Sequence, residues 1–157
     1  MIKSLIVVCI LFVACTSATE VKSCGNGVPL PLNVEISGCN DLPCNVVKGT
    51  TAVMNIEFVS AKDNTEQLYA QAIMKMMGIS IPFELSGNTA NVCDNLLDGK
   101  TCPIAKDEKA IYVMKLDIDA YFPETRTSVQ ISLVDKEIGP IACFAWDMNI
   151  IADKTMA

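Results

Sequence analysis

Apolar and polar residues alternate along most of the chain. The alternating stretches cover residues 30–36, 52–58, 68–76, 110–118, 129–133 and 144–150. In 110–118, for example, Tyr112, Met114 and Leu116 share one side of the pattern, whereas Lys115 and Asp117 share the other. Because successive side chains of a strand point to opposite faces, this pattern predicts strands with one buried face.

Turn-forming residues separate these stretches. Gly, Pro, Asn and Asp occur at 38–40, 48–49, 62–65, 86–88, 98–99 and 139–140. Six or seven short strands without a long helical period predict one all-β domain, an antiparallel sandwich. The apolar stretch 61–77 is predicted as a strand that runs into an extended loop, because Pro82 would break a helix there.

The first residues read as a secretory signal peptide. Lys3 precedes an apolar run over 5–14, and small residues end at Ala18. The run is too short to span a bilayer comfortably. We therefore expect residues 1–18 to be removed and residues 19–157 to form a single domain that is secreted to the extracellular fluid.

Cysteine usage agrees with export. Eight cysteines less the two in 1–18 leave six: Cys24, Cys39, Cys44, Cys93, Cys102 and Cys143. Six cysteines in a short secreted chain predict disulfides but allow 15 pairings. Short separations favour Cys39–Cys44 and Cys93–Cys102, which leaves the other two for each other. A zinc site is disfavoured, because there is no C-x-x-C pair and no His.

Charge and missing motifs argue against several functions. The net charge is −6, or −7 without Lys3, which disfavours nucleic acid as a partner. The absence of His excludes Ser-His-Asp and Cys-His catalysis, and no phosphate-binding or dinucleotide motif is present. Asp117 and Asp119 alternate with apolar residues and Glu124 follows, so a solvated outer face is favoured over a carboxylate site. We expect no enzyme activity, cofactor or metal.

Methionine is abundant, with eight residues in the chain. Six of them fall in the predicted strand region: Met54, Met74, Met76, Met77, Met114 and Met148. Methionine is flexible and fills irregular apolar space. On composition alone, these residues favour a filled sandwich core over a ligand cavity.

The cysteines and their flanking residues resemble a known family. The matching segments are Val21-Lys22-Ser23-Cys24-Gly25, Gly38-Cys39, Pro43-Cys44, Lys48-Gly49, Cys102-Pro103-Ile104 and Ala142-Cys143-Phe144. Together they resemble the ML family of lipid-recognition domains, and within it the Niemann-Pick type C2 sterol carriers, insect-type ones in particular. Residues 139–143 are also similar to the end of the group 2 mite allergens. The resemblance runs from about residue 21 to 151.

The resemblance implies an immunoglobulin-like sandwich of two antiparallel sheets that enclose a hydrophobic cavity. It also implies the disulfides Cys24–Cys143, Cys39–Cys44 and Cys93–Cys102. The family's pocket positions fall on Ile36, Phe83, Ile118 and Phe122. Phe122 stands where the sterol carriers tend to have Tyr.

Two further features belong to this site. Trp146 lies in a segment, 144–147, that departs from the sterol carriers, and it shares the inward face with Phe144 and Met148. We expect Trp146 to line the cavity. Met77 and Ile79 are expected to form an apolar lip at its mouth, where a membrane or receptor makes transient contact.

These expectations describe a monomeric carrier of a hydrophobic small molecule, a cholesterol-like sterol or a long-chain fatty acid. The alternatives are an innate-immune protein that binds a microbial glycolipid and a chemosensory carrier of a hydrophobic semiochemical. The acidic charge argues against a glycolipid phosphate. Glu57 removes an N-glycosylation signal at Asn55, which favours extracellular fluid over the lysosome.

Overall fold

The computed structural model describes residues 18–25 and 27–153, so nearly all of the predicted signal peptide lies outside the described residues. Nine strands and one short 3-10 helix are assigned in the described part of the chain. They are β1 (Lys22–Ser23), β2 (Asn33–Ile36), β3 (Cys44–Val47), β4 (Thr50–Val59), β5 (Leu68–Met76), β6 (Ile79–Phe83), η1 (Val92–Asn95), β7 (Lys109–Ile118), β8 (Arg126–Asp135) and β9 (Gly139–Ile151). Within these residues, no helix is both long and apolar enough to cross a membrane.

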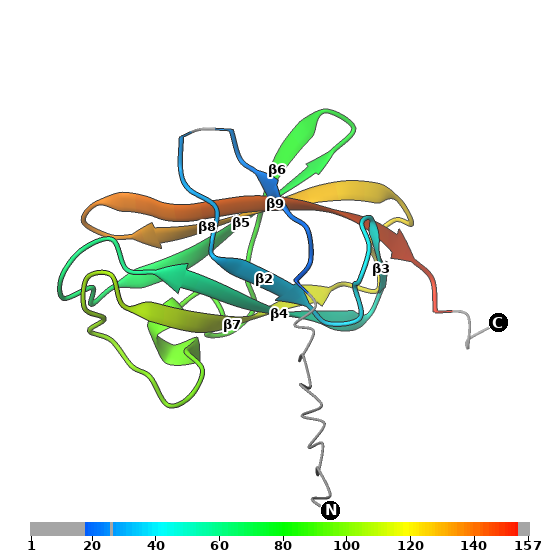
Figure 1. The fold of residues 1–157 in the computed structure, drawn as a ribbon. Coiled ribbons are helices and arrows are strands. Elements are labelled where there is room, and N and C mark those ends of the chain that lie inside the picture. Colours follow the sequence, from blue (N-terminus) through cyan, green and yellow to red (C-terminus); the bar gives the residue numbers. More distant parts are fainter. Residues whose placement is uncertain (1–17, 26, 154–157) are drawn as a thin grey trace, which may run out of the picture.

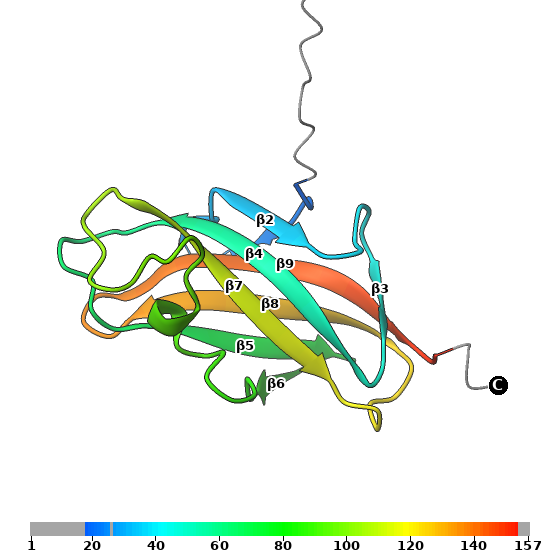
Figure 2. The same ribbon diagram turned by 90° about the horizontal axis from the view of Figure 1, so that it is seen from below.

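The strands form two layers. The large sheet has the order β1-β9-β8-β5-β6, with β3 also paired to β9, and the small sheet has the order β2-β4-β7. Figure 2 shows the small sheet lying across the face of the large one. All pairs are antiparallel except β3 with β9, which is parallel. The predicted all-β sandwich of two sheets is confirmed.

The long alternating stretches form the long strands. The structure differs from the sequence-based prediction at the edge strands. Leu30 and Leu32 were predicted to be buried in a strand, but both precede β2 and are exposed. Residues 78–82 were predicted as a loop, whereas 79–83 form β6. Pro82 is tolerated there because β6 is an edge strand, where a missing N–H costs no ladder bond.

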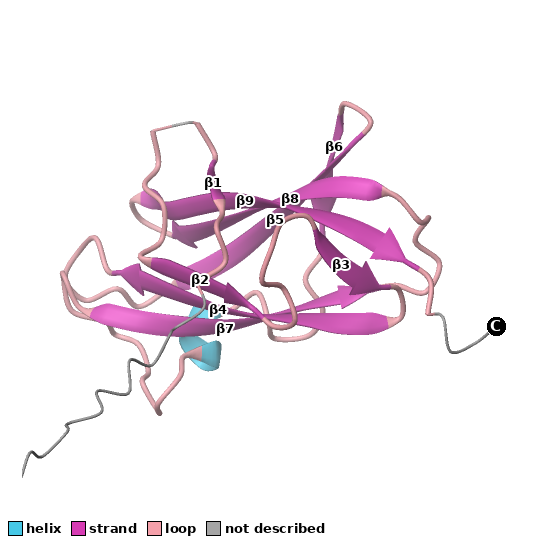
Figure 3. Ribbon diagram, turned by 45° about the vertical axis from the view of Figure 1, so that its right-hand side comes forward, coloured by secondary structure: helices cyan, strands magenta, loops and turns pink. Residues whose placement is uncertain are grey.

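The inward side chains of both sheets form one apolar core. Its largest fully buried members are Trp146, Tyr112, Phe58 and Phe144. Burial raises the pKa of Tyr112, whose hydroxyl donates to the Thr89 carbonyl at 2.6 Å. This bond links β7 to the segment that leads into η1. Figure 3 shows η1 beside the small sheet.

The structure contains the three disulfides that the family resemblance implies. Cys24–Cys143 joins residues 119 apart and fixes the N-terminal segment to β9. Beside it, Lys22 Nζ lies 2.7 Å from the Asp147 carboxylate, and this hydrogen bond is the main cause of the lowered pKa of Asp147.

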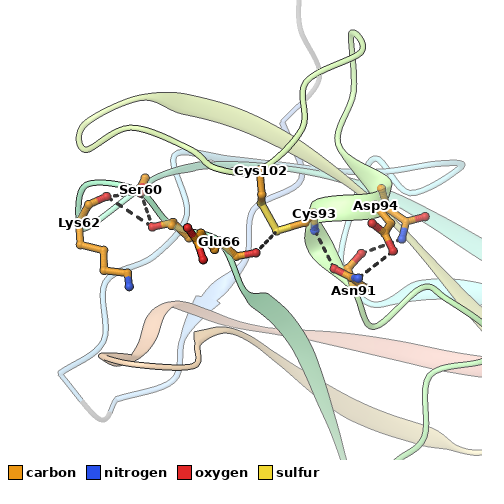
Figure 4. Close-up of a disulfide and its surroundings, with 9 residues drawn as sticks. Ser60, Lys62, Glu66, Asn91, Cys93, Asp94 and Cys102 are labelled. Atoms are coloured by element: carbon orange, nitrogen blue, oxygen red, sulfur yellow. Dashed lines mark hydrogen bonds between the residues drawn. A yellow bond between two sulfur atoms is a disulfide. The ribbon is translucent and has the colours of Figure 1, made fainter.

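Cys93–Cys102 closes the loop that contains η1 (Figure 4). The Asn91 side chain caps η1 by accepting from the Cys93 backbone N–H at 3.1 Å, and its amide donates to Asp94 at 2.7 Å. Single bridges connect Asn91 to Tyr69 of β5 and Leu96 to Tyr112 of β7. This segment therefore links the two sheets along their β5 and β7 side.

We predict that the long disulfide stabilises the fold more than a short one does. In the loop-entropy model, the Cys24→Ala/Cys143→Ala variant should lose about 5 kcal/mol of unfolding free energy, and Cys39→Ala/Cys44→Ala about 2 kcal/mol. Denaturant unfolding of the two variants measures the difference. Equal losses would show that loop length is not the source of the stabilisation.

Candidate functional site

Three of the predicted pocket residues are buried in the core between the sheets. Ile36 ends β2 and Ile118 ends β7, so they lie on opposite edge strands of the small sheet. Trp146 lies in the middle of β9, on the large sheet. All three belong to the same apolar cluster, although they come from separate parts of it.

Phe83 and Phe122 are brought together. Their ring centroids lie 6.0 Å apart, with the ring planes inclined at 41°. Phe83 is the last residue of β6 on the large sheet, and Phe122 lies in the loop between β7 and β8. Both rings are half-buried and pack against the core. The pair therefore joins the two sheets at the side where β6 is the edge strand.

Exposed apolar side chains lie on the β5–β6 hairpin and next to Phe122. Met77 and Ile79, the predicted lip, are 90% and 62% exposed. Sequence reasoning missed two neighbours: Ile81 is 45% exposed, and Tyr121, next to Phe122, is 94% exposed. We call Met77, Ile79, Ile81 and Tyr121 the apolar rim. The alternation of Ile79, Ile81 and Phe83 was the available signal, but it was assigned to a loop.

The hairpin between β5 and β6 presents Met77 at its tip, and Figure 1 shows this hairpin projecting from the edge of the large sheet. Met76 pairs with Ile79, which leaves Met77 and Gly78 as a two-residue turn. Their φ angles are 50° and 80°. Two positive φ values are typical of a type I′ turn, which favours Asn-Gly and makes Met an unfavourable first residue. The chain thus holds an exposed Met in a backbone conformation that costs free energy.

A row of residues crosses the inward face of the large sheet from the rim to the core. Ile81 of β6 pairs with Met74 of β5, Met74 pairs with Val129 of β8, and Val129 pairs with Trp146 of β9. Paired residues lie on the same face of a sheet. The row therefore runs from an exposed edge to a fully buried indole.

The polar groups near these elements have structural roles. Asp117 lies on the outer face, as expected, and accepts a hydrogen bond from the Thr51 hydroxyl at 2.7 Å, the main cause of its lowered pKa. The surface hollow lined by Lys62, Glu66 and Asp135 is polar. In residues 18–25 and 27–153, no group of three or more His, Cys, Asp or Glu is placed to hold a metal. The β6 side of the molecule is therefore suited to burying apolar groups.

Comparison with known proteins gives a consistent picture. The model of the ML domain matches residues 18–150. NPC intracellular cholesterol transporter 2 of Bos taurus is 29% identical over 139 residues, which cover 87% of this chain and 87% of that protein. The mite group 2 allergen Lep d 2 of Lepidoglyphus destructor is 24% identical over 143 residues, covering 91% and 94%.

Two solved structures are similar in fold. A Niemann-Pick type C2 protein from Japanese carpenter ant has a TM-score of 0.71 at 19% identity, covering 84% of this chain and 99% of that one. Chicken MD-1 complexed with lipid IVa has a TM-score of 0.52 at 18% identity, covering 83% and 88%. The immunoglobulin-like architecture expected from the resemblance is thus confirmed.

We predict that Phe83 and Phe122 are energetically coupled. In a double-mutant cycle of Phe83→Ala and Phe122→Ala, the interaction term should be about 0.5–1.5 kcal/mol, because the ring at the end of β6 packs against the ring in the β7–β8 loop. Phe83→Ala combined with Tyr121→Ala is the control and should be additive, since Tyr121 is almost fully exposed. An interaction free energy of zero for the phenylalanine pair would mean that the ring contact does not stabilise this edge of the fold.

Proposed function

The chain belongs to the ML domain family, and we propose that it is a carrier that binds a hydrophobic lipid between its two sheets and transfers it without chemical change. The observation that carries this proposal is the continuous apolar path from the rim to the core. The path begins at exposed Ile79 and Ile81, passes the Phe83–Phe122 pair and reaches the buried inward face. The relatives named as cholesterol transporters, similar over most of the chain, support the same function.

Burial supplies the binding free energy. Apolar area removed from water contributes roughly 25 cal/mol per Å², and a sterol or long alkyl chain is almost entirely apolar. Room for it has to come from rearrangement of the core. Four buried methionines face the interior from both sheets: Met54, Met74, Met114 and Met148. Their flexible side chains are suited to adapting to a guest.

A cholesterol-like sterol and a long-chain fatty acid are the proposed ligands, and a semiochemical of similar polarity would use the same site. Apolar walls discriminate weakly among such molecules. A microbial glycolipid fits less well, because its phosphates need cations. Lys48, in the turn between β3 and β4, is already paired with the Glu124 carboxylate of the β7–β8 loop at 3.2 Å. The likeness to MD-1 supports the shared fold alone.

The compartment in which the protein acts is proposed from the same features. We propose that residues 1–18 are a signal peptide and that residues 19–157 act outside the cell as a monomer. Three disulfides suit an oxidising compartment. The apolar rim then makes transient contact with the membrane or receptor that gives up or receives the lipid.

Lipid transfer between vesicles tests the proposed function. With labelled cholesterol and oleate, the protein should speed transfer and return both lipids unaltered.

Ile118→Gln should weaken binding about tenfold or more, because it places a desolvated amide at the end of β7 in the core. Val113→Gln, a half-buried position on the outer face of the same strand, is the matched control and should bind normally. Normal affinity in a folded Ile118→Gln protein would place the lipid elsewhere, and altered lipid at catalytic turnover would contradict a carrier.

Met77 provides a separate test of the rim. Met77→Asn should raise the unfolding free energy by about 0.5–1 kcal/mol, because Asn tolerates the positive φ of the turn. The same change should slow transfer from vesicles while leaving the affinity for dissolved lipid unchanged. Ile138→Asn, at an exposed apolar residue in the β8–β9 turn, is the control and should leave transfer unaffected. Unchanged transfer in Met77→Asn would remove the hairpin tip from the membrane contact.

A further inference from the structure

The outer edge of β6 is an open strand edge. In a two-residue hairpin the closing pair, here Met76–Ile79, is a hydrogen-bonded pair, and such pairs alternate with non-hydrogen-bonded ones along an antiparallel ladder. Ser80 therefore directs its backbone N–H and C=O away from β5. Ser80 is exposed, and among the described residues it makes no backbone hydrogen bond to another segment. The edge thus presents one donor and one acceptor to solvent.

The outer edges of the small sheet are covered by the chain itself. On β2, the Val34 carbonyl accepts from the Thr19 N–H at 2.8 Å, and the Ile36 N–H donates to the Thr19 hydroxyl at 3.2 Å. On β7, the Ile111 carbonyl accepts from the Leu97 N–H at 2.8 Å. In the described part of the chain, no segment covers the outer edge of β6 in this way.

The residues of β6 do little to protect this edge against pairing. Proteins commonly guard an open edge with charged side chains or Pro. Strand β6 reads Ile-Ser-Ile-Pro-Phe and carries no charge. Pro82 lacks an N–H, so it limits the length of any pairing without preventing it at Ser80. Ile79 and Ile81 flank Ser80 and are 62% and 45% exposed, so a strand paired at Ser80 would bury both.

A second copy of the same strand is complementary to this edge. When two β6 strands run antiparallel about Ser80, the two Ser80 residues exchange both of their N–H···O=C bonds. In this register Ile79 of one copy lies opposite Ile81 of the other, on the same face of the sheet. Met77 lies opposite Phe83 of the second copy, where a thioether–ring contact is favourable. The pairing therefore covers three of the four residues of the apolar rim or brings them against apolar groups.

Charge does not oppose this arrangement. Lys75 of β5 pairs with Ser80, so the two Lys75 residues would be three strand spacings apart. That separation is roughly 14 Å, longer than the Debye length of about 8 Å at physiological salt. The contact is small, since each copy supplies one short strand and its hairpin tip. It buries roughly 1,000 Å² in total, below the size of stable complexes, which predicts weak and reversible association.

We propose that the protein forms a reversible homodimer in which β6 pairs antiparallel with β6 of a second copy, centred on Ser80. The dimer covers the apolar rim, and dissociation exposes it. The inference goes beyond the proposed function and rests on it only for the consequence at the membrane. The dimer is the form present in solution at high protein concentration, and the monomer is the form that contacts the membrane.

Sedimentation equilibrium of the disulfide-bonded protein tests the pairing. The wild type should dimerise with a dissociation constant of about 10–500 μM. Ser80→Pro removes an N–H that points away from β5, so it should keep the hairpin and weaken dimerisation about tenfold or more. Ser80→Ala retains the N–H and is the matched control, with wild-type dimerisation expected. If Ser80→Pro does not fold, Ser80→Lys serves instead, because it places two cations directly opposite each other.

Cross-linking tests the register. The Cα atoms of a hydrogen-bonded pair lie about 5.5 Å apart, within the range of a disulfide, so oxidised Ser80→Cys should form a covalent dimer. Lys75→Cys is the control, because its two copies would be roughly 14 Å apart, too far to be bridged. The covalent dimer should lose binding to phosphatidylcholine vesicles. The Ser80→Cys monomer with its new thiol alkylated should bind them like the wild type.

The contrary outcomes are separate. A wild-type protein that stays monomeric up to about 1 mM overturns the dimer. Dimerisation that survives both Ser80→Pro and Ser80→Lys, or equal cross-linking of Lys75→Cys and Ser80→Cys, overturns the β6 register. Vesicle binding by the covalent dimer overturns its role in covering the rim. Dimerisation is measured without lipid, so a protein that dimerises as expected but transfers no lipid contradicts the carrier function alone.

Discussion

Strand β9 holds the large sheet together. Its thirteen residues pair with β8 along one side, and with β1 and β3 along the other. Its inward residues Phe144, Trp146 and Met148 are fully buried in the core, and Cys143 anchors the N-terminal segment to it. Hydrogen bonding along both edges leaves the strand little freedom. The position of Trp146 is accordingly fixed by backbone pairing rather than by side-chain packing alone.

The unequal size of the two sheets creates the exposed edge. A three-stranded sheet cannot cover the inward face of the larger one, and the edge strand β6 is left partly uncovered. Ile79 and Ile81 are therefore exposed although they lie on the same face of β6 as Phe83. The Phe83–Phe122 contact packs the end of β6 against the β7–β8 loop at this edge. This edge joins the core to solvent through apolar side chains alone, which is the physical basis for proposing lipid entry there.

The interior contains adaptable side chains. Methionines from both sheets can change rotamer at little cost, so shape imposes little selectivity. A lipid bound in such a core would gain its affinity mainly from the burial of its hydrocarbon.

The long strands, the all-β sandwich and the family could be inferred from the sequence alone. Alternation of period two is a local property, so β4, β5, β7, β8 and β9 could be identified from their own residues. The inward placement of Ile118 and Trp146 followed from the same pattern. The short strands β1 and β3 were missed, because they owe their existence to β9, a partner strand distant in sequence. Strand β6 pairs with β5, its neighbour in sequence, and was missed because its alternating residues next to Pro82 were assigned to a loop.

Which residues meet depends on the tertiary structure. Phe83 and Phe122 are separated by 39 positions, and nothing local indicates that their rings touch. The exposure of Leu30, Leu32 and Ile81 also depends on where the facing sheet ends. The buried indole N–H of Trp146, which has no acceptor among the described residues, is the strongest case. Whether a buried donor has an acceptor depends on every chain segment around it, and hydrophobic patterning carries no information about hydrogen-bond partners.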